Sequence, residues 1–246
     1  MFEHFILMTS SYKRGTRIAL HFAFDGGIDE NKIETPIRAI YDSIGEAAKF
    51  STHYVCTDDA SWDSVVAYDP FFSDAYLLES LEEFIFIMKQ DMDITGLDIA
   101  KYILSKRPFT HLELKKLTYL CYADYLCKYD EPICRDKVFA FRYGPVLETV
   151  YDKFFGCKDT LSFEDEKIAK SRLLIDGASE RVKSIDETLK KYDSASVSEL
   201  IDITHCKNGP WSMKDATRFY QIIEDALILD RHHFEDEYYS KHFIKQ

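Results

Sequence analysis

Residues 110–155 read THLELKKLTYLCYADYLCKYDEPICRDKVFAFRYGPVLETVYDKFF, and the segment FRYGP (141–145) interrupts their second half. Apolar residues recur at helical spacing over residues 112–127, in a stripe wide enough to need covering on both flanks. This pattern predicts the central helix of a bundle. Beyond FRYGP, apolar side chains resume helical spacing, and we expect a second helix over residues 146–155.

Caps and breaks divide the rest of this half of the chain into further helices. Thr110 with Glu113, and Ser196 with Glu199, have the spacing of a capping box, in which the hydroxyl accepts an N–H bond and the carboxylate reaches back. We also expect helices over residues 97–103, 178–191 and 215–229. The tail, 230–246, is rich in charge and is expected to be an exposed, partly helical segment.

The first part of the chain has a different pattern. Residues 17–24 alternate apolar and polar side chains, which predicts a half-buried strand. Further strands are expected over 53–56 and 64–68, and helices over 36–49, from Pro36, and over 76–88, capped by Ser73. The fold class is therefore α+β: a small α+β module over residues 1–93, followed by a mostly α-helical domain over 97–246.

Charge separates the two parts as well. Residues 1–95 hold 7 Lys or Arg against 17 Asp or Glu, a balance of −10, whereas residues 96–246 hold 24 against 26, a balance of −2. The acidic part is a poor binder of phosphate backbones, because that affinity depends on Lys and Arg. A basic partner surface is its natural complement.

The chain carries no pattern typical of a secreted or membrane protein. Its start, MFEHFILM, lacks the basic segment and long apolar core of a signal peptide. No segment approaches the roughly 18 apolar residues that span a bilayer. Cys121 and Cys127 are about 9 Å apart along a predicted helix, too far for a disulfide. We expect a cytoplasmic protein with reduced thiols.

The sequence holds no recognised catalytic or cofactor motif, so we expect no catalytic, cofactor or metal site. The Walker A, dinucleotide, His-Glu-x-x-His and Gly-x-Ser-x-Gly patterns do not occur. His205 and Cys206 are adjacent on a helix and point about 100° apart, which favours a structural role over a nucleophile and base. His232 and His233, with acidic neighbours, could gather a metal, but we favour an exposed polar tail.

Arg142 and Tyr143 have two competing interpretations. In the structural one, the Arg142 guanidinium satisfies helix carbonyls or a carboxylate such as Glu148, while Tyr143 packs in the interior. In the functional one, the two side chains face a partner protein, since Arg and Tyr are enriched at interface hot spots. The sequence leans toward the structural interpretation and leaves both open.

Four segments in order resemble the Panacea domain, also described as the SocA-like or GepA-like phage-associated family. The resemblance covers about residues 97–230, and one mild departure is the run TYLCY at 118–122, where a small-aromatic run is usual. The segments are DIAKYIL (98–104), THLELKKLTY (110–119), FRYGPV (141–146) continuing to Tyr151, and residues 200–205 ahead of GPW (209–211).

The resemblance implies a mostly helical domain that serves as the antitoxin of a bacterial or phage toxin–antitoxin system and neutralises a protein toxin by direct binding. One branch of the family is instead understood as a proteolytic adaptor that delivers its toxin to a protease. The resemblance does not identify the toxin. The candidate toxin contacts are Arg142, Tyr143, Tyr119, Trp211 and His205.

The N-terminal module lies outside the resemblance. Its negative balance leads us to expect contact with a basic toxin surface and a contribution to partner choice. Alternatives are a proteolytic adaptor, a phage regulatory protein that binds host machinery, or an enzyme whose site would gather His21, His53 or Asp59 in this module. Homo-oligomerisation stays open, and neither a membrane nor a nucleic acid is expected as a partner.

Overall fold

The computed structural model describes residues 1–214 and 221–243, and the chain divides into two compact units, Met1–Asp93 and Ile94–Gln246. Each unit contains both helices and a sheet, so the fold class is α+β, as predicted. Within the described ranges, no helix has both the length and the apolar character needed to cross a membrane.

The N-terminal unit is built on a four-stranded sheet of order β3-β1-β2-β4. The antiparallel strands are β1 (Phe2–Ser11), β2 (Thr16–Asp25) and β3 (Ser51–Thr57), and the short β4 (Ala75–Leu77) joins β2 in parallel. The strands predicted over residues 17–24 and 53–56 are therefore confirmed.

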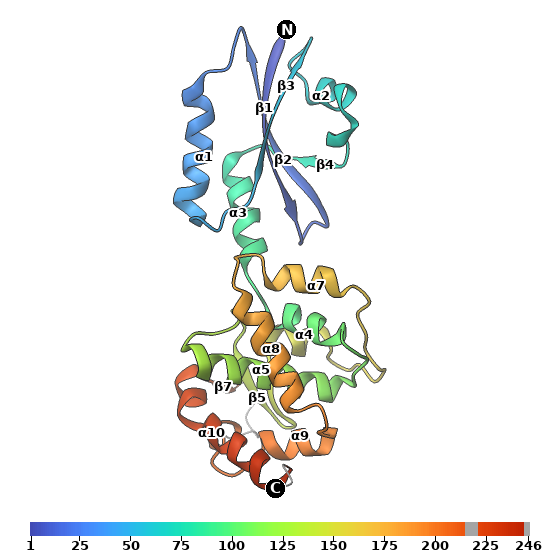
Figure 1. Ribbon diagram of the computed structural model, residues 1–246, viewed down its shortest axis with the longest axis vertical. Helices are drawn as coiled ribbons and strands as arrows, with labels where there is room; N and C mark the ends of the chain where they lie inside the picture. The colour runs from blue at the N-terminus through green and yellow to red at the C-terminus, as the bar shows by residue number, and fades with distance from the viewer. Residues whose placement is uncertain (215–220, 244–246) are drawn as a thin grey trace. The chain divides into compact units, whose positions relative to one another are not determined.

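Helices cover both faces of this sheet (Figure 1). On one face, the apolar sides of α1 (Glu30–Ile44) and α3 (Leu81–Met92) pack against Phe5, Leu7 and Ile18. On the other face, α2 (Trp62–Tyr68) and the 3-10 turn η1 (Pro70–Phe72) pack against Ile6 and Met8.

The strand predicted over residues 64–68 is wrong, because these residues belong to α2. Ser61 caps that helix: its hydroxyl accepts the N–H of Ser64 at 3.2 Å. Val65 then turns fully inward against the sheet. A single inward position in a two-turn helix resembles the alternation of a short strand, so periodicity alone could not separate the two.

Two helix starts also differ from prediction. The last helix of this unit is capped by Ser80, whose hydroxyl accepts from the Glu83 N–H at 3.1 Å, and not by Ser73. The first helix begins well before Pro36, because Asp29 caps it through the N–H of Asn31. In both cases the sequence interpretation overlooked the side chain that caps the helix.

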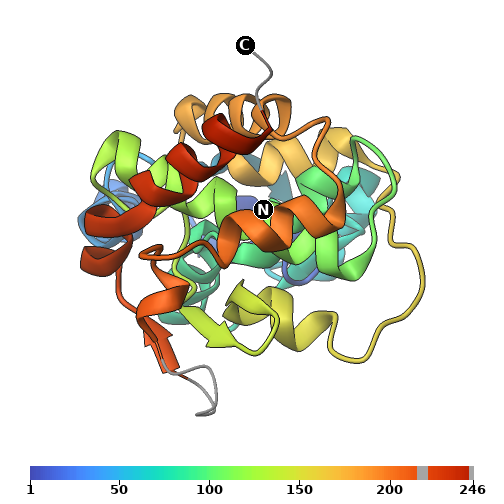
Figure 2. The ribbon, with the colours of Figure 1, turned by 90° about the horizontal axis from the view of Figure 1, so that it is seen from below.

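The helix α5 (His111–Tyr129) is the centre of the C-terminal unit. Twelve of its nineteen residues are buried, which requires neighbours on every side and confirms the predicted central helix. The neighbours of α5 are α4 (Gly96–Leu104), α8 (Ser179–Lys191), α9 (Val197–Thr204), α10 (Asp225–His242) and β6 (Gly144–Leu147). Figure 2 shows α9 and α10 on the side toward the viewer.

The two expected capping boxes have different outcomes. At α9, Ser196 and Glu199 form the complete box, as predicted. At α5, the Thr110 hydroxyl accepts the Glu113 N–H at 3.2 Å, but the Glu113 carboxylate instead accepts from Arg107 at 2.8 Å. A charged donor within reach displaced the backbone N–H that the box would have used.

The helix predicted over residues 146–155 is confirmed only in its middle part. The strand β5 (Val138–Phe141) pairs antiparallel with β6 and with β7 (Gln221–Ile223), and α6 (Glu148–Lys153) follows. Pairing with β5 thus takes Val146 and Leu147 out of the predicted helix. Pro145 is compatible with this arrangement because β6 is an edge strand of the sheet.

The end of the chain departs from prediction too. Of the helix predicted over 215–229, residues 215–220 lie outside the described ranges, residues 221–223 form β7, and α10 begins at Asp225. α10 continues to His242, so the tail is helical. It is not an exposed polar segment, since His232 is 2% and Glu235 0% exposed.

A buried polar network explains why these two residues face inward. His232 bridges two carboxylates, with Nδ1 2.6 Å from Glu235 and Nε2 2.8 Å from Asp124. The Tyr119 hydroxyl donates to Glu235 at 3.0 Å. Burial alone would lower the pKa of His232, but the hydrogen bonds and charges of the two carboxylates outweigh it and raise that pKa well above its ordinary value.

We expect His232→Phe to lower the free energy of unfolding by about 3–5 kcal/mol, because it leaves the buried Glu235 carboxyl without its cationic partner. Urea unfolding at neutral pH measures this. His233→Phe, at the exposed neighbouring position, is the matched control and should change stability by less than about 0.5 kcal/mol. Equal losses in the two variants would contradict the role of the network.

Candidate functional site

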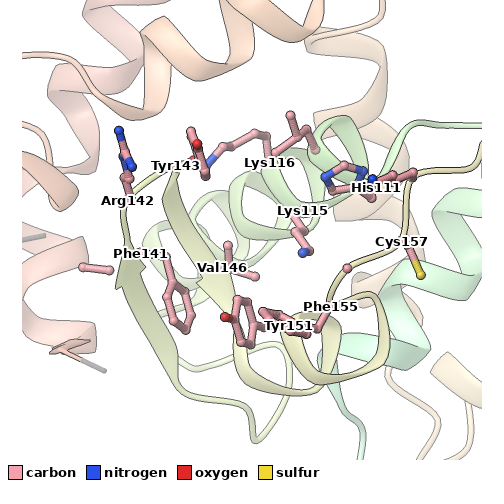
Figure 3. Close-up of a pocket in the computed structure, with 14 residues that line it drawn as sticks. His111, Lys115, Lys116, Phe141, Arg142, Tyr143, Val146, Tyr151, Phe155 and Cys157 are labelled. Carbon is pink, nitrogen blue, oxygen red and sulfur yellow. The ribbon is translucent and has the colours of Figure 1, made fainter. Parts of the chain in front are cut away.

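The segment at 141–145 forms a two-residue hairpin turn. Phe141 pairs with Gly144 across β5 and β6, so Arg142 and Tyr143 make the turn itself. Both side chains are exposed, Tyr143 to 62%, and the Arg142 guanidinium lies 5.7 Å from the centre of the Tyr143 ring. The two residues therefore stand at the tip of a short, defined projection (Figure 3).

Lys116 of α5 holds this turn from the interior. Its side chain is 1% exposed, and its Nζ donates a hydrogen bond to the backbone carbonyl of Tyr143. Gly144 has a φ of +101°, and a Cβ there would collide with Lys116 Nζ and lie 2.7 Å from His205 Cε1. Both the backbone conformation and the available space thus require glycine.

Trp211 and His205 support the same hairpin. Trp211 lies in the 3-10 turn η2 (Trp211–Met213), and its Nε1 donates to the Phe141 carbonyl at 2.8 Å. Its ring centre is 3.9 Å from that of His205, whose Nδ1 is 2.7 Å from the Ile201 carbonyl. Burial lowers the pKa of His205. These two partly buried rings hold the backbone of the turn.

A cavity of about 600 Å³ opens beside the hairpin, between the start of α5, the strands β5 and β6, and the segment from α6 to Lys158. One wall is aromatic: the rings of Phe141 and Tyr151 stack with centres 4.0 Å apart, and Phe155 lies 5.4 Å from Tyr151. Figure 3 shows these rings along one side, with Lys115 directed into the space beside them.

Among the described residues, the side chains that line this cavity include basic groups and no acidic one. The basic groups are His111, Lys115, Lys116, Arg142 and Lys158. Lys115 is 8% exposed; its Nζ donates to the Phe154 carbonyl at 3.3 Å and lies 5.2 Å from the Tyr151 ring centre. Burial lowers the pKa of Lys115, so an anion in the cavity would stabilise its charged form.

Lys116 is the more deeply buried of the two lysines. Burial lowers its pKa to about 7, while the negative charge of Glu235 opposes that shift and the positive charge of Lys115 adds to it. The hairpin is therefore anchored by a group that exchanges a proton near neutral pH. Through Glu235, this anchor also connects to the His232 network in α10.

Three side chains could be taken for a metal site. Asp124, His232 and Asp236 place ligand atoms within 4.8 Å of one another. Lys191 already supplies positive charge there, since its Nζ donates to Asp124 at 3.3 Å and to Asp236 at 2.6 Å. Both nitrogens of His232 also face carboxylates. The arrangement is a charge network between α5, α8 and α10.

The enzyme alternative named three residues in the N-terminal unit. His21 and His53 both lie opposite Ile6, on the two sides of β1, so a full strand separates them. Asp59 accepts the N–H of Ser61 at 2.7 Å within its own loop. The hydrogen-bond contacts of the two histidines are with other residues: His21 Nε2 lies 2.7 Å from His4 Nδ1, and His53 Nε2 lies 2.8 Å from the Ser51 hydroxyl.

The structure gathers four of the five candidate contacts around the hairpin: Arg142, Tyr143, Trp211 and His205. Tyr119 is buried in the core instead. The sequence interpretation missed the cavity and its lysines. The sequence did hold a signal for them. Lys115 and Lys116 stand between Leu114 and Leu117, in a helix whose apolar stripe is so wide that it must be covered on both flanks.

Residues 114–212, which include the hairpin and both lysines, match the family model described as "Antitoxin SocA-like, Panacea domain". Antitoxin SocA of Caulobacter vibrioides (strain NA1000 / CB15N) is 28% identical over 126 residues, which is 47% of this chain and 67% of that protein. No solved structure matches the chain.

We expect Gly144→Ala to lower the free energy of unfolding by about 2–4 kcal/mol, through backbone strain and overpacking against Lys116. Gly156→Ala is the matched control, because Gly156 also has a positive φ, of +73°, but open space around its Cα. That variant should lose only about 1–2 kcal/mol. Denaturant unfolding compares the two, and an equal loss would argue against the tight contact at Gly144.

Lys116→Met tests the buried anchor through pH. The folded pKa of about 7 lies below the ordinary value of 10.5, so between these limits the unfolded chain binds more protons and stability rises with pH. The free energy of unfolding of wild type, relative to that of Lys116→Met, should therefore rise from pH 7 to pH 10, by at most about 1.4 kcal/mol per pH unit. Lys167→Met, at an exposed position of α7 (Glu166–Leu173), controls for the loss of one lysine. Parallel curves for wild type and Lys116→Met would contradict this.

Proposed function

We propose that this chain, whose residues 114–212 belong to the Panacea-domain family of SocA-like antitoxins, is an antitoxin that binds its protein toxin directly through the hairpin of the C-terminal unit. The family supports the antitoxin role; direct binding and the surface used are our proposal. The observation that carries it is the exposed Arg142–Tyr143 pair at a tip whose backbone is anchored from inside.

The hairpin tip combines the two properties that a recognition site needs. Arg and Tyr are the residue types enriched at energetic hot spots of interfaces. Lys116, Trp211 and Gly144 fix the backbone beneath them, so less conformational entropy is lost when a partner binds. The structural interpretation expected Tyr143 to pack in the interior, whereas its side chain is 62% exposed. It is the backbone of the turn, and not these side chains, that is held from inside.

We further propose that the acidic N-terminal unit contributes to partner choice. Residues 1–93 carry the same −10 balance as residues 1–95, since Ile94 and Thr95 are uncharged. An acidic surface attracts a basic partner over distance and disfavours acidic ones. In this proposal the chain acts without catalysis, and bound antitoxin covers the surface that the toxin needs for its activity.

Tyr143→Ala should weaken toxin binding by about 2 kcal/mol or more, and Arg142→Ala should weaken it in the same direction. The toxin to use is the product of the neighbouring reading frame, with rescue of growth on co-expression and affinity of the purified pair as readouts. Ile168→Ala removes an exposed apolar side chain elsewhere in the unit and is the control. Unchanged affinity in folded Tyr143→Ala would overturn the proposed surface. Loss of toxin from cells, rather than its accumulation in a complex, would favour delivery to a protease.

A chain restricted to residues 94–246 tests the role of the N-terminal unit. We expect it to bind the toxin more weakly, and with a smaller loss of affinity between low and high salt, because the acidic unit supplies screened long-range attraction. Binding at several salt concentrations measures both effects. Full neutralisation by the shortened chain would contradict a contribution to partner choice.

A further inference from the structure

We infer that the cavity beside the hairpin receives the C-terminal residue of the toxin, with its free carboxylate at Lys115 and its apolar side chain against Phe141 and Tyr151. This inference rests on the proposed function, because it names what part of the toxin the site takes. It follows from three properties of the cavity: its charge, its aromatic wall and the depth of its lysine.

The charge of the cavity calls for an anion. An ammonium carries three hydrogen-bond donors, and the structure gives that of Lys115 one carbonyl acceptor, at 3.3 Å. No carboxylate is present among the described residues that line the cavity, although a buried charge without a counter-charge is unfavourable. A carboxylate at Lys115 would supply both the missing acceptor and the missing charge. Lys158, which also lines the cavity, adds attraction of the same sign.

The aromatic wall calls for an apolar body attached to that anion. Phe141, Tyr151 and Val146 line the cavity together with Lys115, and an inorganic anion would make no apolar contact with them. A C-terminal residue carries its carboxylate and its side chain on the same carbon. It can therefore place one at Lys115 and the other against the stacked rings. A volume of about 600 Å³ lies within the usual range of small-ligand sites.

The depth of Lys115 favours a chain end over an internal residue. Lys115 is 8% exposed, so little room remains around its ammonium for an incoming group. An internal Asp or Glu would require a chain that both enters and leaves the cavity. A C-terminus enters end-on with a single strand. Capture of a terminal carboxylate is also an established mode of peptide recognition.

The test uses the full chain and short defined peptides. The probes are N-acetyl-Ala-Phe with a free carboxylate, the same peptide as its C-terminal amide, and N-acetyl-Phe-Asp-Ala amide, whose carboxylate is internal. Calorimetric or NMR titration gives each affinity. We expect the free acid to bind about tenfold or more tightly than the amide, a difference of about 1.4 kcal/mol. The internal-acid peptide should behave like the amide.

Two lysine variants assign the effect to the cavity. Lys115→Met keeps a long apolar side chain in this buried position and should reduce the acid-to-amide ratio to about one. Lys153→Met removes an exposed lysine of the adjacent α6 that does not line the cavity, and should leave the ratio unchanged. Equal binding of acid and amide to wild type, or an acid preference that survives in folded Lys115→Met, would overturn the inference.

A second, independent test uses the toxin itself. Extending its C-terminus with a polar tail should weaken binding about tenfold if the terminus enters the cavity. Tight binding that neither the tail nor Lys115→Met affects would overturn the inference and leave the proposed hairpin contact standing. Failure of the toxin to bind at all would remove the proposed function, and the peptide titration would still decide whether the cavity prefers a terminal carboxylate.

Discussion

The hydrogen bond from the buried Lys116 Nζ to the Tyr143 carbonyl is the interaction on which the hairpin of the C-terminal unit depends. It fixes the hairpin turn to the central helix, and it leaves room for no side chain at Gly144. The negative charge of Glu235 opposes the cost of burying Lys116, and Glu235 is held by His232 and Tyr119. Hydrogen bonds thus join the hairpin to α5 and α5 to α10, and the charge of Glu235 acts on Lys116 between them.

This arrangement separates the backbone and side-chain roles of the turn. The carbonyls of Phe141 and Tyr143 are bound by Trp211 and Lys116, whereas the side chains of Arg142 and Tyr143 remain exposed. Next to this projection lies a concavity with an aromatic wall and basic groups. In the proposed function, a partner would meet a projection and a pocket on one surface, which is how hot-spot residues and the pockets they fill are usually arranged.

Much of the fold could be predicted from local pattern. The central helix, the strand at 17–24 and the capping box at Ser196 and Glu199 each follow from residues within a few positions of one another. The sheet around the hairpin could not be predicted so, because β5 also pairs with β7 some eighty residues later. The inward face of α10 depends on Asp124, which lies 108 residues from His232. For the site, residue type pointed to the hairpin tip. Lys115 could not be predicted as a site residue, because its place in the cavity depends on its burial and a lysine in a helix is ordinarily solvated.

The exposure of Arg142 and Tyr143 has a consequence for how this molecule can change. Their side chains are exposed, so substitution there should cost the fold little, whereas substitution of Gly144, one position away, should destabilise it. In the proposed function, residues that set partner choice and a residue that sets the fold are thus neighbours in the sequence. Under that proposal, the partner preference of the tip can change by single substitutions that leave the protein folded.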